Sequence, residues 1–242
     1  DGYSDVIVGA DGYSSNTGIA YIFFGGALMN NAADVTVTGE SAGSNFGFSV
    51  SSAGDINGDG FSDVLIGAFG YSVLTGRAYV YFGGASMNNV PDVTMTGETA
   101  GEYFGYSVSS AGDLNGDGYD EIIAGAIGYN SNTGRVYSYD YYMKNEITQD
   151  LTMSGETADN YFGFSVSSAG DVNGDGYDDV IVGANRYSSY TGRAYIFFGG
   201  TSIDNSADVT LTGQTINNFF GFSVSSAGDV NGDGYDDIIC GA

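Results

Sequence analysis

Four short acidic loops carry the residues of this chain that could bind a metal. Each has nine residues, with oxygen-bearing side chains at positions 1, 3, 5 and 9 and a glycine at position 6, and each starts 58 residues after the last. Several hard oxygen ligands around one point are what Ca²⁺ requires, and the glycine permits the sharp turn that folds the loop back on the ion. The loops are DINGDGFSD from Asp55, DLNGDGYDE from Asp113, DVNGDGYDD from Asp171 and DVNGDGYDD from Asp229.

This spacing assigns four candidate side-chain ligands to each loop, and it predicts at least three bound Ca²⁺ ions. The candidates are Asp55, Asn57, Asp59 and Asp63; Asp113, Asn115, Asp117 and Glu121; Asp171, Asn173, Asp175 and Asp179; and Asp229, Asn231, Asp233 and Asp237. The chain also opens inside such a loop, with Asp1 at position 5 and Asp5 at position 9. We therefore expect residues 1–242 to be one continuous repeat array, four periods of 58 residues plus a ten-residue overlap, cut from a longer protein. A permuted ring of four blades is the alternative.

The loops differ from the EF-hand, the common helical Ca²⁺ motif. An EF-hand places a bidentate glutamate at position 12 between two helices. Position 12 here is apolar or cysteine, and the residues that follow position 9 resemble a strand. The residues at position 12 are Ile66, Ala124, Val182 and Cys240.

The rest of each 58-residue period predicts four strands and no helix. In the period from Phe46 they are residues 46–54, 63–68, 77–84 and 92–98, with a turn at 69–76. The third is aromatic and β-branched and the fourth alternates apolar with threonine, both typical of strands. We therefore predict an all-β fold, a β-propeller-like array of four-stranded antiparallel blades of about 58 residues per repeat. The Ca²⁺ loop then joins the first two strands of a blade, so metal binding would fix the register of that hairpin.

The net charge of −25 limits the possible partners. Such a polyanion repels nucleic acid and anionic lipid, and no apolar run approaches the roughly 20 residues of a membrane helix. Four Ca²⁺ ions would reduce the net charge to −17. Sites of this type bind in extracellular modules at about 10⁻⁴–10⁻³ M, so we expect an extracellular or cell-surface location. The chain has no histidine, and its one cysteine, Cys240, has no partner base, so we expect no enzyme.

The repeats resemble FG-GAP repeats, the units of the integrin α-subunit β-propeller. Phe46-Gly47, the loop from Asp55 and Gly67-Ala68 carry this resemblance, and the other repeats match at intervals of 58 residues. The resemblance implies that the residue at position 7 also binds Ca²⁺, through its backbone carbonyl; these residues are Phe61, Tyr119, Tyr177 and Tyr235. Three features depart from the family pattern. The proline of Gly-Ala-Pro is absent, glutamate replaces aspartate at residue 121, and the segment Tyr137–Asp150 loses the third-strand pattern.

Function follows less directly from these patterns. The first hypothesis is an extracellular structural or adhesive protein whose partner is a protein or glycan at the cell surface, or equivalent repeats through self-association. The alternatives are a glycan-binding propeller and a non-catalytic accessory domain of a secreted hydrolase. Four tyrosines in register could stack on sugars or simply pack the blades: Tyr13, Tyr71, Tyr129 and Tyr187. Arg77, Arg135 and Arg193 could recognise an acidic ligand or pair with local acids, and Tyr137–Asp150 is either a special contact or a drifted edge.

The assembly also remains open at this level. The blocks from Phe162 and Phe220 differ at two of 23 positions, which favours an extended array of recently duplicated units. The family resemblance instead favours a closed propeller. We expect a larger object in either case, a propeller of more than four blades or a fibre-like array.

Overall fold

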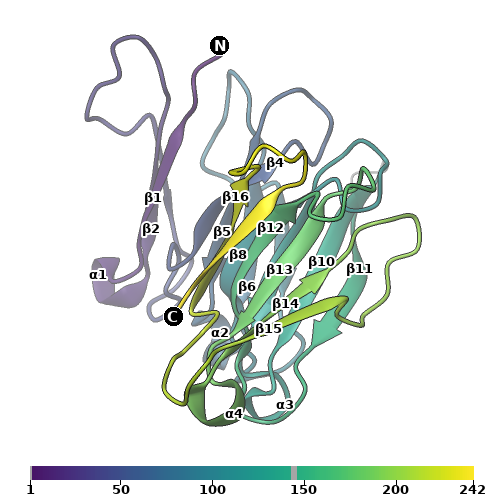
Figure 1. Ribbon diagram of the computed structural model, residues 1–242. Helices are drawn as coiled ribbons and strands as arrows, with labels where there is room; N and C mark the ends of the chain where they lie inside the picture. Colours follow the sequence, from purple (N-terminus) through teal and green to yellow (C-terminus); the bar gives the residue numbers. More distant parts are fainter. Residues whose placement is uncertain (1, 143–145) are drawn as a thin grey trace.

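The chain folds into five consecutive antiparallel sheets, seen in a computed structural model that describes residues 2–142 and 146–242 (Figure 1). We call the first four blades 1 to 4 and the last the terminal sheet. Blade 1 is β1 (Val6–Ala10), β2 (Ile19–Phe23) and β3 (Val35–Thr38); blade 2 is β4 (Val50–Gly54), β5 (Asp63–Ala68), β6 (Arg77–Tyr81) and β7 (Val93–Thr96); blade 3 is β8 (Phe104–Gly112), β9 (Glu121–Ala126), β10 (Arg135–Tyr142) and β11 (Glu146–Ser154); blade 4 is β12 (Phe162–Gly170), β13 (Asp179–Ala184), β14 (Arg193–Phe197) and β15 (Val209–Thr212); the terminal sheet is β16 (Ser223–Gly228) and β17 (Asp237–Gly241).

Blades 2, 3 and 4 each have four strands in chain order, every neighbour antiparallel. This confirms the predicted all-β class and the four-stranded repeat. The first strand of blade 2 is shorter than predicted, because β4 begins at Val50 and not at Phe46. In blades 3 and 4 the same strand spans its full nine residues, with a register shift near its start.

The hydrophobic core lies between adjacent blades. Successive residues of a strand point to opposite faces of a sheet, so Leu65 joins the core between blades 2 and 3, whereas Ile66 joins the core between blades 1 and 2. Both side chains are fully buried. This two-sided burial explains why the second strand of each repeat is a continuous apolar run with no polar alternation.

Two glycines of each repeat allow neighbouring blades to approach closely. A Cβ on Gly67 would lie 2.1 Å from the carbonyl oxygen of Gly105, which belongs to the Phe-Gly pair of the next repeat. Gly125 and Gly183 meet Gly163 and Gly221 in the same way, at 2.3 and 2.0 Å. The recurrence of Phe-Gly and Gly-Ala is therefore a packing requirement between blades.

The turn between the second and third strands of each repeat is left-handed, a feature that the sequence did not predict. These turns are α1 (Tyr13–Asn16), α2 (Tyr71–Leu74), α3 (Tyr129–Asn132) and α4 (Tyr187–Tyr190), and in Figure 1 α2 to α4 lie together at the lower end. In α2 the φ angles of Ser72, Val73 and Leu74 are 47°, 59° and 63°. Such a conformation costs roughly 1–2 kcal/mol per residue. It aims the carbonyls of Val73 and Leu74 at the backbone N–H groups of Gly101 and Tyr103, which precede the next blade.

Candidate metal centres

Each acidic loop joins the first and second strands of a sheet, as the sequence predicted. Loop 113–121 joins β8 to β9 and loop 171–179 joins β12 to β13. The first strand of each full blade starts beside a left-handed turn, through a bridge such as that between Gly76 and Phe104, and runs toward the loop. The acidic loops therefore lie at the end of the array opposite the left-handed turns, and position 9 is the first residue of the second strand.

The predicted ligands organise their own loop through backbone hydrogen bonds. In loop 171–179 Asp171 Oδ1 accepts hydrogen bonds from the N–H groups of Gly174 and Asp175, at 2.6 and 3.1 Å, and its Oδ2 accepts one from Gly176 at 2.9 Å. Asn173 Oδ1 accepts from the Asp175 N–H and Asp175 Oδ1 from the Tyr177 N–H. Loops 55–63, 113–121 and 229–237 repeat most of these bonds. The side chains at positions 1, 3 and 5 are thus held by backbone N–H groups of their own loop.

The acid at position 9 is buried at the base of the loop. Asp63 and Asp179 are at most 1% exposed, and each accepts two backbone hydrogen bonds. For Asp63 the donors are Ile56, at position 2, and Gly83, in the connection between the third and fourth strands. Burial, reinforced by neighbouring loop acids, raises the pKa of both carboxyls to about 6, against the opposing effect of these backbone donors.

In the described part of the chain, the position-9 acids of the opening loop and of loop 229–237 also accept backbone hydrogen bonds. Asp5 Oδ1 accepts a hydrogen bond from the Gly25 N–H at 2.7 Å, and Asp237 Oδ2 accepts one from Val230 at 3.0 Å. Backbone N–H donors, chiefly that of Gly234, lower the pKa of Asp229. Asp1 lies outside the described residues.

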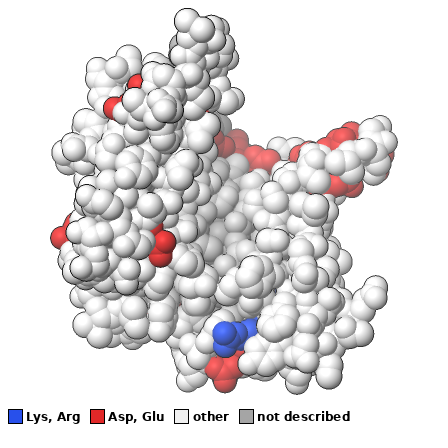
Figure 2. Space-filling model, turned by 90° about the vertical axis from the view of Figure 1, so that its left-hand side faces the viewer, with Lys and Arg blue, Asp and Glu red and all other residues white. Residues whose placement is uncertain are grey.

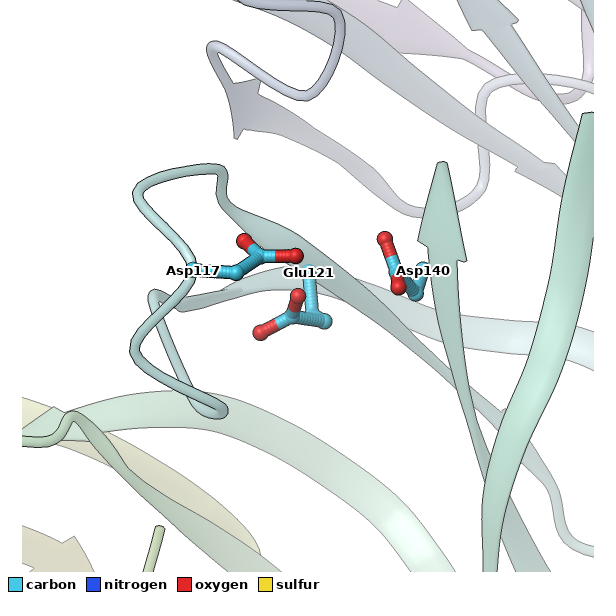
Figure 3. A group of neighbouring side chains, drawn as sticks. All are labelled: Asp117, Glu121 and Asp140. Carbon is cyan, nitrogen blue, oxygen red and sulfur yellow. The ribbon is translucent and has the colours of Figure 1, made fainter. Parts of the chain in front are cut away.

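Loop 113–121 differs from the others because a second carboxylate approaches its position 9. Oxygen atoms of Asp117, Glu121 and Asp140 all lie within 4.8 Å of one another, the only such acidic group among the described residues. Figure 3 shows Asp140 on β10, with its carboxylate directed toward the loop that carries Asp117. Glu121 is fully buried, and burial, followed by the charges of Asp140, Asp117 and Asp113, raises its pKa to about 8.

The ligand atoms that these loops offer fit a hard cation. The side chains at positions 1, 3, 5 and 9 offer carboxylate and amide oxygens, the ligand type that Ca²⁺ prefers. Among the described residues, only the carboxylate oxygens of Asp117, Glu121 and Asp140 lie within 4.8 Å of one another. The charged groups that perturb Asp63, Glu121 and Asp179 are all acids. A buried carboxylate near like charges either takes up a proton, as its raised pKa indicates, or has its charge compensated by a cation. The carbonyl ligand expected at position 7 remains a prediction.

Neighbouring loops are joined by the aspartate at position 8, a residue that was not among the ligands predicted from the sequence. Its carboxylate accepts a hydrogen bond from the position-1 backbone N–H of the preceding loop, at 2.8 to 3.0 Å. The three pairs are Asp55 with Asp120, Asp113 with Asp178, and Asp171 with Asp236. The sequence does contain a pattern that points to this residue, because aspartate recurs at position 8 in three of the four complete loops.

The aromatic residue at position 7 strengthens this connection. The ring of Tyr119 lies against Gly58, at position 4 of the preceding loop, where a Cβ would be 2.2 Å from a ring carbon. Tyr177 lies in the same way against Gly116, and Tyr235 against Gly174. The candidate metal centres therefore form a connected row along one end of the blades.

The repeated arginines pair with local acids between blades, one of the two alternatives that the sequence left open. The pairs are Arg77 with Glu40, Arg135 with Glu98, and Arg193 with Glu156, at 2.9, 3.5 and 2.6 Å. Each guanidinium also covers the ring of the tyrosine six residues earlier, with its central carbon 3.5 to 3.8 Å from the ring centroid. Three of the four tyrosines considered as sugar platforms, Tyr71, Tyr129 and Tyr187, are therefore covered by arginine. Tyr13 has no arginine at the matching position and is 50% exposed.

Acidic side chains are more numerous than basic ones on the face of the molecule drawn in Figure 2. On the face drawn in Figure 2, acidic atoms lie at several separate places, many of them in the upper half, and a group of basic atoms lies near the lower edge beside acidic ones. Within the described residues, no helix has the length and apolar character needed to cross a membrane.

Comparison with known proteins defines the class to which this fold and these loops belong. The FG-GAP repeat model matches residues 46–81, 104–139, 162–197 and 220–242, more than half of the chain. The chain belongs to the FG-GAP repeat family, as the sequence resemblance indicated.

The chain is also similar to integrin α-subunits. It is 33% identical to integrin alpha-5 of Xenopus laevis over 211 residues, which cover 81% of this chain and 20% of that protein. It is 34% identical to integrin alpha-PS2 of Drosophila melanogaster over 253 residues, which cover 90% of this chain and 17% of that protein. The chain thus spans about a fifth of the length of these relatives. Integrin α-subunits are non-enzymatic cell-surface proteins, and the chain is an integrin α-like repeat region.

Proposed function

We propose that this chain is the Ca²⁺-binding repeat region of an extracellular protein with an adhesive or structural role. The observation that carries the proposal is the row of acidic loops, in which buried position-9 carboxylates have only acids as charged neighbours. Ca²⁺ would supply the missing counter-charge. The side chains at positions 1, 3, 5 and 9 would hold it, together with the position-7 carbonyl.

The row explains why a repeat protein would need the metal. Each loop closes the hairpin between the first two strands of a sheet, and in three of the four complete loops a position-8 aspartate joins it to the preceding loop. A cation in each loop would therefore stiffen single blades and also the junctions between them. Partners at the cell surface, whether protein, glycan or equivalent repeats, would then meet a rigid surface. We infer that the repeats continue into a larger protein.

Isothermal titration calorimetry of the chelator-treated chain with Ca²⁺ tests this proposal. We expect at least three sites, and we expect Mg²⁺ to bind more weakly because it tolerates irregular oxygen geometry less well. The matched variant Asp175→Asn should weaken one site only. Titration without any heat of binding at millimolar Ca²⁺ would contradict the proposal.

The glycan-binding alternative has less support. Sugar stacking needs an exposed aromatic face, and arginine covers the rings of Tyr71, Tyr129 and Tyr187. We therefore favour adhesion through protein or repeat contacts.

A further inference from the structure

The third and fourth strands of blade 3 form an extended hairpin that is absent from blades 2 and 4. In those blades the third strand ends at Tyr81 or Phe197, and an irregular connection follows. In blade 3, β10 continues to Tyr142 and pairs with β11, with a register shift between Ser138 and Tyr139. The described residues of the segment Tyr137–Asp150, which the sequence marked as unusual, belong to β10 and β11.

The hairpin changes what faces the base of loop 113–121. In the other blades the irregular connection supplies a backbone N–H to the position-9 carboxylate, from Gly83 to Asp63 and from Gly199 to Asp179, at 2.8 and 2.9 Å. Asp140 stands where the other repeats have phenylalanine, at residues 24, 82 and 198. Its carboxylate lies within 4.8 Å of ligand oxygens of Asp117 and Glu121 (Figure 3).

Loop 113–121 also differs from the other loops at position 9. Position 9 is glutamate only here, and its longer side chain bonds the Leu114 N–H at 2.7 Å and the Asn115 Nδ2 at 2.8 Å. In blades 2 and 4 the connection between the third and fourth strands donates a backbone N–H to the position-9 carboxylate. In blade 3 the Asn115 side chain donates to Glu121, and the Asp140 carboxylate lies nearby. Among the described residues, no hydrogen-bond donor contacts the Asp140 carboxylate and no basic side chain pairs with this group.

The geometry points to a specialised cation site in blade 3, in which Asp140 supplies a fourth carboxylate in addition to Asp113, Asp117 and Glu121. The other loops offer three carboxylates at the ligand positions. Affinity for hard cations rises with the number of charged ligands, so this site binds Ca²⁺ more tightly than its neighbours. The gain is larger for trivalent lanthanide ions, because the attraction scales with the charge of the ion. The inference rests on the proposed function, since it requires that the loops bind cations.

Site-resolved occupancy at limiting metal is the direct test. Crystals of the metal-stripped chain are soaked with one molar equivalent of Tb³⁺, and anomalous scattering gives the occupancy of each loop. We expect Tb³⁺ to occupy loop 113–121 first in the unmodified chain. In Asp140→Asn the ion should spread over the loops, and calorimetry with Ca²⁺ should show the tightest site weakened about tenfold with the others unchanged.

The control variant removes one charge elsewhere. Asp204 is exposed, and the matching residues of blades 1 and 2 are Asn30 and Asn88. All three accept a hydrogen bond from the backbone N–H two residues further along the chain. Asp204→Asn should leave the order of filling unchanged. Equal filling of all loops in the unmodified chain, or an Asp140→Asn variant that still fills loop 113–121 first, would overturn the inference while leaving the proposed function intact. Failure of every loop to bind Tb³⁺ and Ca²⁺ would overturn both.

Discussion

Loops 113–121 and 171–179 belong to adjacent blades, yet the buried carboxylate at position 9 has different surroundings in the two loops. In blade 4, Asp179 is stabilised by the backbone N–H groups of Val172 and Gly199, and its pKa is about 6. In blade 3, Glu121 has one backbone donor and faces Asp140, and its pKa is about 8. A change in a distant connection, from an irregular turn to a hairpin, has thus altered the electrostatics of a loop whose nine-residue pattern is nearly unchanged.

The largest expected effect is common to both loops and comes from removing the metal. Binding to the folded state alone stabilises a protein by about 2.7 kcal/mol per site at 100-fold saturation. We therefore expect a large decrease in the melting temperature when a chelator replaces millimolar Ca²⁺, measured by differential scanning calorimetry. The variant Asp117→Ala in Ca²⁺ should show a smaller decrease, because it impairs one loop. Superimposable melting curves with and without chelator would contradict the proposed role of the loops.

The next effect separates the two loops through pH. Glu121 has a folded-state pKa of about 8, raised from 4.5, so the folded chain without metal binds more protons than the unfolded chain between these values. Its contribution to stability is present below pH 4.5 and is lost as the pH rises through 8. For Asp179 the corresponding window lies between 3.8 and about 6. Chelated protein should therefore be more stable at pH 6 than at pH 8.

Variants at the two positions show which loop is responsible. Glu121→Gln should remove most of the loss between pH 6 and pH 8, whereas Asp179→Asn should leave it, as measured by urea unfolding in chelator at each pH. In saturating Ca²⁺ the dependence should reverse, because protons compete with the cation for the same oxygens. Identical pH slopes for Glu121→Gln and the unmodified chain would show that the Glu121 carboxyl does not titrate in this range.

The sequence predicted the repeat and the strand order, because these depend on local spacing. The Ca²⁺ ligands at positions 1, 3, 5 and 9 stay a prediction. The sequence did not predict the contacts that depend on a neighbouring blade. The acceptor role of Asp178 requires the backbone of Asp113 to lie beside it, and the approach of Asp140 to Glu121 requires the hairpin to extend. Both residues are separated along the chain from the groups that they meet, so a pattern confined to one repeat does not reveal them. The left-handed turn is similar, since its carbonyls are aimed at residues some 30 positions away.

A smaller effect tests the junction between the two loops. Asp178 Oδ2 accepts the Asp113 N–H at 2.9 Å, and its own N–H bonds the Asp113 carbonyl. Burial and the nearby acids Asp120, Asp113 and Asp236 raise the pKa of its carboxyl. A hydrogen bond to a charged group contributes about 1.5–3 kcal/mol, and the repulsion offsets part of this. We expect Asp178→Ala to lower the unfolding free energy by about 1–2 kcal/mol. Asp178→Asn keeps an acceptor, so it should retain most of the stability.

The smallest expected effect compares the ion pairs that join these blades. Arg193 lies 2.6 Å from Glu156, donates to Thr212 and covers the ring of Tyr187, whereas Arg135 lies 3.5 Å from Glu98. Partly exposed ion pairs contribute up to about 1 kcal/mol and are screened by salt, while cation–π contacts at such sites contribute about 0.5–1 kcal/mol. We expect Arg193→Met to cost about 1 kcal/mol in low salt.

The salt dependence separates the two contributions. Methionine keeps the apolar stem but removes the charge, so the part of the loss that disappears in 1 M NaCl measures the pair with Glu156. That part should be larger for Arg193→Met than for Arg135→Met, because the shorter ion pair has the stronger Coulomb interaction. The remainder, insensitive to salt, reflects the lost contact with the tyrosine ring and should be similar in the two variants, since the guanidinium lies 3.8 Å from the Tyr187 centroid and 3.5 Å from that of Tyr129. A salt-sensitive loss of equal size in both variants would show that the difference in distance between the two pairs has no energetic consequence in solution.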